Sequence, residues 1–201
     1  MQKSFASALV LFATSCYATF RLESCPQYTP MENFKLSSYL GTWYEIARDA
    51  QTPFELFSDC TTATYTPIDE STVKVDNRAW WWLFNWGWDQ EVGKATLTDP
   101  SNASLSVAFF DREVSSDDRA NYTILDTDYD TYSIVYSCES MWGGWASFDY
   151  MWILARETSL DADLMANLIG KIESTIPNYE FFEDAKLPRV GESCEYDTFD
   201  L

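Results

Sequence analysis

The sequence of 201 residues contains no histidine, and this absence excludes several kinds of chemistry. Without an imidazole there is no Ser–His or Cys–His nucleophile pair and no histidine-ligated metal site. Basic residues are scarce as well: 13 Lys and Arg stand against 32 Asp and Glu, and the formal net charge is −19. A chain this acidic is a poor candidate for binding nucleic acid or anionic lipid through charge. We therefore predict no nucleic-acid partner.

The sequence also lacks an apolar run long enough to cross a bilayer. Its N-terminal run, residues 5–13, is short, follows Lys3 and precedes small residues near Ala18. This order is typical of a secretory signal peptide cleaved after Ala18, and the alternative is a buried N-terminal helix. We find no internal repeat, low-complexity segment or interdomain linker. The sequence thus predicts a signal peptide over residues 1–18, one domain over residues 19–201, and a soluble, secreted protein.

Cysteine usage agrees with export. Cleavage would remove Cys16 and leave four cysteines, Cys25, Cys60, Cys138 and Cys194. An even number of cysteines in an exported chain argues for disulfide bonds. Four cysteines allow three connectivities, and the spacing alone does not choose among them.

Two triplets fit the N-glycosylation pattern, Asn102-Ala103-Ser104 and Asn121-Tyr122-Thr123. Such triplets also arise by chance. In an exported chain we predict that Asn102 and Asn121 are glycan acceptors.

Short β-rich segments separated by turn residues follow one another from Trp43 to Glu157. We predict strands at residues 42–48, 61–66, 73–81, 90–98, 105–110, 121–125, 132–137 and 151–156. Eight such strands fit an all-β, up-and-down antiparallel barrel whose interior is wide enough for a small ligand.

One helix is predicted after the strands. An apolar stripe recurs at a spacing of four, formed by Leu160, Leu164, Leu168, Ile172 and Ile176. Thr158 or Ser159 would cap the start of this helix, and Pro177 would end it. Residues 179–183 are a candidate for a short additional strand.

Three motifs lie in order along the predicted barrel: Leu40-Gly41-Thr42-Trp43-Tyr44-Glu45-Ile46, Thr127-Asp128-Tyr129, and Trp152-Ile153-Leu154-Ala155-Arg156. With the cysteines around them, they resemble the lipocalins, and among these the branch of apolipoprotein D, bilin-binding protein and Lazarillo. The resemblance covers almost the whole mature chain. It implies an eight-stranded calyx with one C-terminal α-helix packed outside and one small hydrophobic ligand held non-covalently inside.

The resemblance also assigns roles to residues. It implies that Gly41, Trp43, Thr127, Asp128, Tyr129 and Arg156 are structural, with Trp43 plugging the base and Arg156 against its ring. It implies the disulfides Cys25–Cys138 and Cys60–Cys194. It also places the first, third, fifth and seventh strand connections, near residues 49–59, 82–89, 111–120 and 139–150, around the open end of the barrel, here called the mouth.

Strand alternation, combined with the resemblance, predicts which side chains line the cavity. The predicted ligand-binding residues are Val75, Asn77, Ala79, Trp81, Trp86, Phe109, Tyr122, Ile124, Val135, Ser137, Trp152 and Leu154. In this phase Asn121 faces outward. Candidate ligands are a fatty acid, a sterol, a retinoid, a carotenoid or a tetrapyrrole. No interior Lys or Arg is evident toward the mouth, which favours a neutral ligand unless Arg78 or Arg112 reaches inward.

Tryptophans are concentrated in segments assigned to the mouth, namely residues 80–88 together with Trp142 and Trp145. Three interpretations remain open. The indoles form an aromatic gate for ligand capture, they dock on a neutral membrane or lipoprotein surface, or they pack on one another or on another subunit. Docking to a membrane or partner through residues 80–88 is therefore the alternative function.

A lipocalin-type enzyme is a further alternative. If the four mature cysteines are paired, no thiol remains for a thiol-dependent isomerase, and no pair of Asp and Glu is marked as catalytic by its spacing. We therefore predict a carrier with no catalytic residue, no metal and no cofactor besides its lipophilic ligand. The sequence leaves the identity of the ligand and the oligomeric state open.

Overall fold

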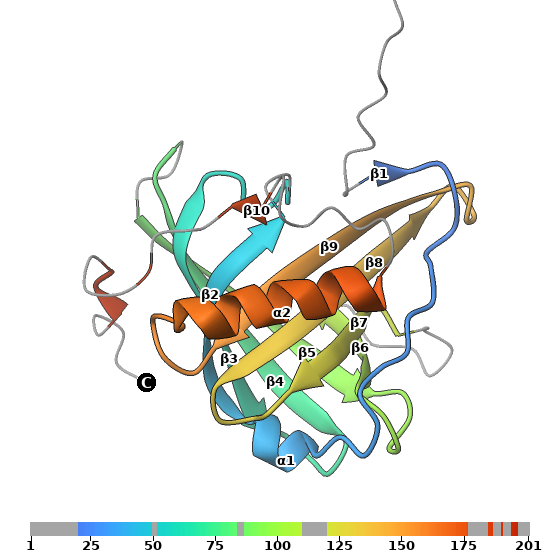
Figure 1. The fold of residues 1–201 in the computed structure, drawn as a ribbon, viewed down its shortest axis with the longest axis horizontal. Coiled ribbons are helices and arrows are strands. Elements are labelled where there is room, and N and C mark those ends of the chain that lie inside the picture. The colour runs from blue at the N-terminus through green and yellow to red at the C-terminus, as the bar shows by residue number, and fades with distance from the viewer. Residues whose placement is uncertain are drawn as a thin grey trace, which may run out of the picture.

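The computed structural model describes residues 20–49, 52–83, 87–109, 120–176, 185–186, 190 and 194–196. Its elements are β1 (Phe20–Arg21), α1 (Leu36–Tyr39), β2 (Gly41–Asp49), β3 (Ser58–Pro67), β4 (Thr72–Trp81), β5 (Gly87–Leu97), β6 (Ser104–Phe109), β7 (Tyr122–Thr127), β8 (Tyr132–Met141), β9 (Ala146–Ala155), α2 (Ala162–Thr175) and β10 (Ala185–Lys186). The strands β2 to β9 pair consecutively, and β9 also pairs with β2 (Figure 1). The sheet is thus a closed antiparallel barrel of eight strands, as the sequence predicted, extended by β1 and β10.

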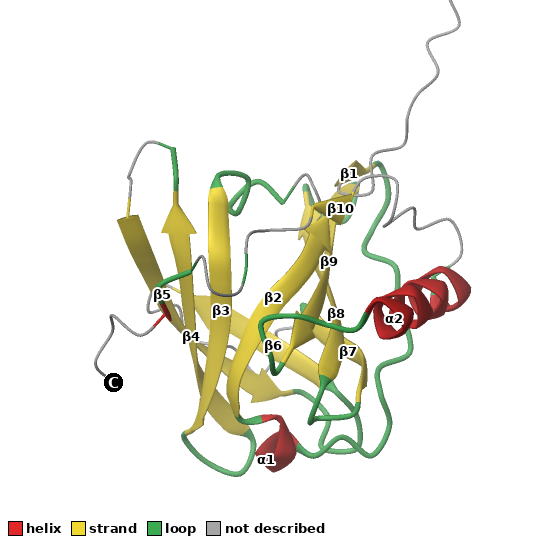
Figure 2. Cartoon of the chain, turned by 60° about the vertical axis from the view of Figure 1, so that its left-hand side comes forward, coloured by secondary structure: helices red, strands yellow, loops and turns green. Residues whose placement is uncertain are grey.

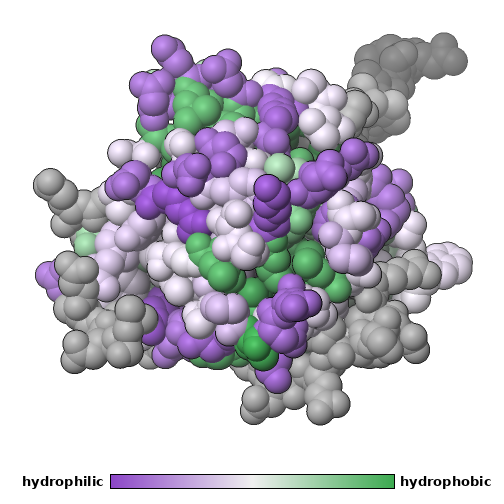
Figure 3. All heavy atoms as spheres, turned by 90° about the horizontal axis from the view of Figure 1, so that it is seen from below, coloured by the Kyte–Doolittle hydropathy of each residue, from purple (hydrophilic) through white to green (hydrophobic). Residues whose placement is uncertain are grey.

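The two ends of the barrel differ. The short helix α1 lies at the lower end in Figures 1 and 2, where the connections β3–β4 and β7–β8 also lie. Strands β4 and β5 meet at the opposite end, as do β8 and β9, which agrees with the predicted mouth. Seen from below, side chains fill the lower end, and a strip of hydrophobic residues runs between hydrophilic ones (Figure 3).

Two hairpins reach further toward the mouth than predicted. Strands β8 and β9 stay paired as far as Met141 and Ala146, so their connection is the turn 142–145 and not a loop over 139–150. Strand β4 ends at Trp81, as predicted, but β5 begins at Gly87 and pairs with it there, so Trp88 is a strand residue and not a loop residue. Cross-strand aromatic packing favours this extension over an open loop.

The inner core fills the lower half of the barrel. Trp43 and Tyr39 are fully buried there, and the indole Nε1 donates to the Tyr39 carbonyl at 2.9 Å. Around them pack inward side chains from most strands, namely Val73, Ala95, Leu105, Ile124 and Val135. The residues next to each of them on the same strand point out of the barrel, because successive side chains of a strand face opposite sides.

A second core lies between the outside of the barrel and α2. Leu168, Ile172 and Ile176 are buried against outward side chains of β8 and β9, including Ile134 and Ile153. The predicted apolar stripe is therefore correct. The predicted cap is wrong: Asp161, and neither Thr158 nor Ser159, accepts from the amides of Asp163 and Leu164. The Asp161 carboxylate also lies at the positive end of the helix dipole.

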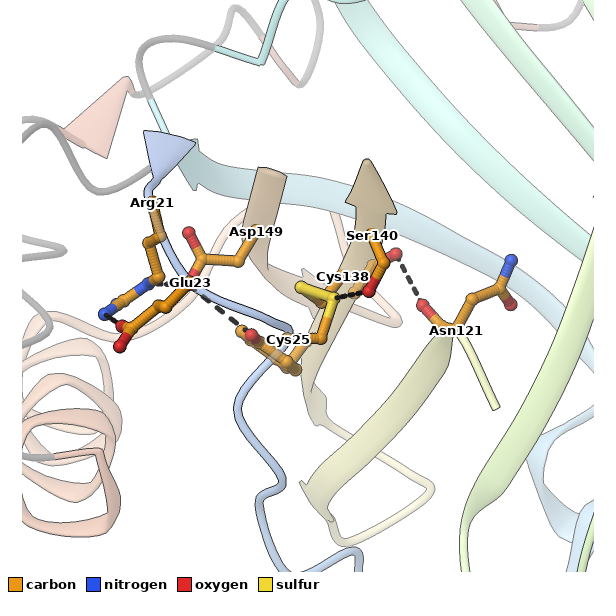
Figure 4. The surroundings of a disulfide bond; sticks show 9 residues. Arg21, Glu23, Cys25, Asn121, Cys138, Ser140 and Asp149 are labelled. Atoms are coloured by element: carbon orange, nitrogen blue, oxygen red, sulfur yellow. Dashed lines mark hydrogen bonds and ion pairs between the residues drawn. A yellow bond between two sulfur atoms is a disulfide. The ribbon is translucent and has the colours of Figure 1, made fainter. Parts of the chain in front are cut away.

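An N-terminal strap, residues 20–35, runs along the outside of the barrel to the closed end (Figure 1). At its upper end β1 pairs with β9, and Arg21 donates to the buried Asp149 at 2.6 Å (Figure 4). Cys25 is bonded to Cys138 of β8. A second disulfide joins Cys60 of β3 to Cys194. Both bonds are those that the family resemblance implied.

Other predictions fall outside the described part of the chain. The proposed signal peptide lies in residues 1–18, and the candidate strand at 179–183 is likewise not described; the two residues of β10 pair with β2 slightly later in the chain. Among the described residues, no helix has the length and apolar character that crossing a membrane would need.

Candidate ligand-binding site

A cavity of about 540 Å³ occupies the upper half of the barrel and opens at the mouth. Its volume lies in the range of pockets that bind small molecules. Each of the eight barrel strands contributes residues to the wall, and β7 does so only through Tyr122 at its mouth end. The connection that follows β2 contributes Phe54 and Glu55. The packed core around Trp43 closes it from below.

Most of the predicted ligand-binding residues lie on this wall: Val75, Asn77, Ala79, Trp81, Phe109, Tyr122, Ser137, Trp152 and Leu154. Ile124 and Val135 point inward but lie in the packed core below the cavity. Trp86 and Arg112 lie outside the described residues. Phe109 is positioned by Gly93, because a Cβ at that glycine would lie 2.7 Å from the Phe109 ring. That these residues bind a ligand stays a prediction.

The floor of the cavity carries a pair of tyrosine hydroxyls. Tyr65 and Tyr122 are hydrogen-bonded to each other at 2.8 Å, and both line the cavity. Burial raises the pKa of Tyr65 to about 12, although its hydrogen bond with Tyr122 acts in the opposite direction. Burial also raises the pKa of Tyr122, and the neighbouring Tyr65 adds to this effect. The floor therefore offers neutral, polar groups to the inner end of a ligand.

An aromatic wall lines the β9 side of the cavity. Tyr150 and Trp152 are two residues apart on β9 and face inward together, with ring centroids 5.9 Å apart. Phe54, from the connection after β2, covers them with its ring 5.2 Å from Tyr150. Trp152 also donates its indole N–H to Glu55 of the same connection at 3.0 Å. These contacts hold the connection over the mouth.

Arg48 is fully buried at the mouth, and no pattern in the sequence predicted a buried arginine there. A β-bulge between Glu45 and Ala47 shifts the phase of β2, so Glu45 and Arg48 lie on the same side. Arg48 pairs with Glu45 and donates to the carbonyl of Ser58 at 2.8 Å. The expectation of no interior cation near the mouth was wrong, but this cation is already engaged by the protein.

Carboxylates are the polar groups that the sequence analysis missed. Glu45, Glu55, Asp89, Glu91 and Glu139 all line the cavity, whereas Arg78 is the one basic residue among the described lining. Asp89 and Glu91 come from β5, whose apolar Val92 faces out and is 48% exposed. In the mouth-end half of this strand the inward positions are acidic and the apolar Val92 faces out, so the alternation of apolar residues gives no sign of these carboxylates. The cavity is apolar but its rim is acidic.

Five of the described tryptophans at the mouth fall into three groups. Trp81 lines the cavity, as predicted. Trp80 and Trp88 pack edge to face across the β4–β5 hairpin with centroids 5.9 Å apart. Trp142 and Trp145, at the tip of the β8–β9 hairpin, are 70% and 81% exposed. These tryptophans therefore lie in different surroundings, and the roles proposed for them stay predictions.

The closed end has the geometry that the motifs implied. The Arg156 guanidinium lies 3.7 Å from the centroid of the Trp43 ring and donates to the carbonyls of Thr42 and Tyr129, each at 2.9 Å. Gly41 has φ of 92° and lies against this arginine, so a side chain there would be strained and crowded. Burial lowers the pKa of Arg156.

The loop Thr127-Asp128-Tyr129 supports this arrangement. One oxygen of the Asp128 carboxylate accepts from the amides of Asp130, Thr131 and Tyr132. These bonds, set against the effect of burial, lower the pKa of Asp128. The turn that they hold presents the Tyr129 carbonyl to Arg156.

The two glycosylation triplets lie at different ends of the barrel. Asn102 follows β5 at the closed end, where its Nδ2 donates to Asp99. Asn121 does not simply face outward: its amide bonds both the N–H and the carbonyl of Val107 and so continues the β6–β7 ladder with a side chain. Glycosylation of Asn121 would require this ladder contact to change, and both acceptors remain predictions.

Among the described residues, no group of three or more His, Cys, Asp or Glu is placed to hold a metal ion. Cys25, Cys60, Cys138 and Cys194 are all disulfide-bonded, so none of them offers a thiol to the cavity. What the site offers chemically is an apolar, aromatic hollow with an acidic rim.

Comparison with known proteins places the chain in a family. The family model of the lipocalin-like domain matches residues 34–181. The Lazarillo protein of Schistocerca americana is 36% identical over 197 residues, covering 96% of this chain and 86% of that protein. Apolipoprotein D of Rattus norvegicus is 36% identical over 160 residues, covering 79% of each chain. The chain is therefore a lipocalin of the branch that includes apolipoprotein D and Lazarillo.

Solved structures agree with the fold. Insecticyanin from the tobacco hornworm Manduca sexta superimposes with a TM-score of 0.66 at 20% identity, covering 87% of this chain and 90% of that one. Lobster apocrustacyanin A1 gives a TM-score of 0.63 at 22% identity, covering 81% and 83%. At these identities the likeness concerns the barrel and its helix alone.

Proposed function

We propose that this lipocalin is a secreted carrier that binds a small hydrophobic ligand in its barrel cavity. The observation that carries the proposal is the cavity of about 540 Å³, open at one end and walled by aromatic and aliphatic side chains above a sealed base. Burial of apolar surface in such a hollow drives binding, and the few polar groups orient the ligand. A sterol, a retinoid, a carotenoid, a tetrapyrrole or a fatty acid fits this description.

Quenching of intrinsic tryptophan emission by retinol tests the proposal. We expect saturable quenching with the wild-type protein. Trp152→Ala removes cavity wall and should weaken retinol binding by ~1–2 kcal/mol, or roughly five- to thirtyfold. Trp145→Ala is the matched control, because it also removes one indole but from a position that is 81% exposed. Equal affinities of the Trp152→Ala variant and the wild type would show that the ligand binds elsewhere.

The proposed binding role is favoured over catalysis by the state of the cysteines. All four cysteines of the mature chain are consumed in disulfides, which removes the nucleophile of a thiol-dependent isomerase. Two long-range disulfides also support an oxidising, extracellular location. Expression in a secreting eukaryotic cell should release a protein whose N-terminal sequence begins at Thr19; retention of the uncleaved chain inside the cell would contradict secretion.

Docking to a neutral lipid surface is a second candidate function, favoured by one hairpin. Trp142 and Trp145 are the most exposed tryptophans of the described chain, and Trp142 adopts φ of 48°, a conformation costly for a bulky residue. Nothing in the described fold covers these rings. Indoles favour the interface of a bilayer, where the ring is buried and the N–H stays hydrated. This observation adds the turn 142–145 to residues 80–88 as a candidate docking surface.

Flotation with phosphatidylcholine vesicles tests docking separately from ligand capture. We expect the wild type to float and the double variant Trp142→Ser/Trp145→Ser to remain in solution while it still binds retinol. Ile68→Ser is the control, since Ile68 is 51% exposed but follows β3 at the closed end. If the wild type fails to float, or the double variant floats equally well, the hairpin is not a lipid anchor.

A further inference from the structure

One side of the cavity is built from hydrogen-bond acceptors. In the β4–β5 ladder, Asn77 is paired with Glu91 and Ala79 with Asp89, and all four residues line the cavity. Because opposed residues in an antiparallel pair point to the same face, the two carboxylates project into the cavity beside the Asn77 amide. Asp89 lies nearer the mouth and Glu91 lies one step deeper.

No basic residue in the described chain neutralises these two carboxylates. Arg78 donates to Asp76, at 3.1 Å, and Arg48 is held by Glu45. Burial raises the pKa of Glu91, and the nearby charge of Asp89 raises it further, which is the behaviour of an acidic pair without a counter-ion. Within the described part of the chain these carboxylates therefore have no counter-ion, and a bound ligand can supply the positive charge.

Two neighbouring polar atoms point to the same conclusion independently. The Oδ1 atom of Asn77 and the Oγ1 atom of Thr61 are buried without a hydrogen-bond partner. Both residues line the cavity, and Thr61 is only 8% exposed. A buried polar atom left unpaired costs free energy, so a ligand that brings hydrogen-bond donors to these atoms is favoured.

The rest of the wall suits the body of the same ligand. Trp81 follows Ala79 in the same phase of β4 and lines the cavity with Trp152 and Tyr150. Indole and phenol faces attract a cation as well as apolar chains. Below them, Val75, Leu154 and the hydroxyls of the tyrosine pair form an uncharged floor.

We propose that the ligand of this lipocalin is a cationic amphiphile: an apolar chain or ring system that ends in a protonated amine. The ammonium group lies at Asp89 and Glu91 and donates to the Asn77 Oδ1 atom, while the apolar part extends toward the floor of the cavity. A carboxylate ligand of the same size meets uncompensated negative charge at this position. This inference rests on the proposed carrier function and names the class of ligand.

A matched series of three probes tests the inference. Decylamine, decanol and decanoic acid share one chain length and differ in the charge of the head group at neutral pH. Each is titrated against the wild-type protein loaded with retinol, and displacement is followed by fluorescence. We expect decylamine to displace retinol at the lowest concentration and decanoic acid at the highest, with a difference of about tenfold or more between them.

Removal of the two carboxylates is the second arm. Asp89→Asn/Glu91→Gln should weaken the binding of decylamine about five- to tenfold, which is the range expected for two partly exposed charge pairs. The affinity for decanol should stay unchanged. Glu70→Gln/Glu173→Gln is the matched control, because it removes two carboxylates from exposed positions after β3 and on α2. Thermal melts verify that each variant is folded. If a variant does not fold, the order in which the three probes displace retinol from the wild-type protein still tests the inference.

The outcomes separate the two proposals. If decanol and retinol bind but decylamine binds no better than decanoic acid, the inference is wrong and the carrier function stands. The inference is equally wrong if decylamine weakens as much in the control variant as in Asp89→Asn/Glu91→Gln. If retinol and all three probes fail to bind, the carrier function itself is refuted.

Discussion

At the base of the barrel, the guanidinium of Arg156 joins segments that are far apart in the chain. It donates to the carbonyl of Thr42 near the start of β2 and to the carbonyl of Tyr129 in the β7–β8 connection. It also covers the ring of Trp43. Lys offers a point charge in place of this planar fork and cannot make the same bonds. Arg156→Lys should therefore lower the free energy of unfolding by ~2–4 kcal/mol.

Urea denaturation measures this loss, and retinol binding under native conditions is the accompanying control. The cavity lies above the core that contains Trp43, so the affinity of the folded variant should match that of the wild type. A variant as stable as the wild type would mean that the arginine contributes little beyond the packing of the indole.

The buried tyrosines give the protein a defined response to alkali. Burial raises the pKa values of Tyr39, Tyr65 and Tyr122, that of Tyr65 to about 12. Because the folded-state values exceed the ordinary value near 10, the associated stability is complete below pH ~10 and is lost as pH rises toward the folded-state values. We expect the thermal unfolding midpoint to decrease as the pH is raised from ~10 to 12. The ultraviolet absorbance should show that some tyrosines of the folded protein ionise only at the upper end of this range.

The Tyr65→Phe variant identifies the source of this effect. Phenylalanine keeps the ring but has no ionisable hydroxyl, so the decline of stability above pH ~10 should be shallower. An unchanged decline would assign it to residues elsewhere in the chain.

At the scale of elements, the strap depends on its disulfide. The Cys25–Cys138 bond spans 113 residues and attaches the strap to β8. The chain-entropy estimate for closing so long a loop is ~4–5 kcal/mol. Cys25→Ser/Cys138→Ser should lose stability on this order, and amide exchange should accelerate in the strap more than in β2 to β9, whose pairing does not involve the bond.

The Cys60–Cys194 bond provides the comparison, because it spans a similar 134 residues but attaches the C-terminal segment to β3. Cys60→Ser/Cys194→Ser should lose a similar free energy and keep the strap protected from exchange. If amide exchange accelerates equally in all segments in both double variants, the Cys25–Cys138 bond does not hold the strap specifically.

At the scale of the whole molecule, the net charge of −19 opposes compactness. Self-repulsion of this size destabilises the folded state, and salt screens it, since the Debye length falls from ~10 Å at 0.1 M to ~3 Å at 1 M. We expect potassium chloride to raise the thermal midpoint at neutral pH. Near pH 4.1, the isoelectric point of the sequence, the same salt should have little effect. A midpoint that falls with salt at neutral pH would contradict this account.

Much of the fold followed from local patterns. The alternation of β2 to β9, the apolar stripe of α2 and the three motifs each predicted an element that the structure contains. Strand ends were less accurate, because the aromatic pair Trp80–Trp88 continues its hairpin beyond the turn signals. The capping residue of α2 was misplaced by two or three positions, since several polar residues in a row can serve as a cap.

The sequence by itself determined the eight strands, the outer helix and most of the apolar cavity wall, because strand and helix periods translate directly into inward and outward faces. The disulfide pairing followed from the resemblance to the lipocalins and not from these periods. Only the tertiary structure decided where the charges lie. The bulge at Glu45 buries Arg48, and the ladder with β4 turns Asp89 and Glu91 inward while the apolar Val92 faces out. Such positions depend on a neighbouring strand across the barrel, and a single strand carries no record of its partner's register.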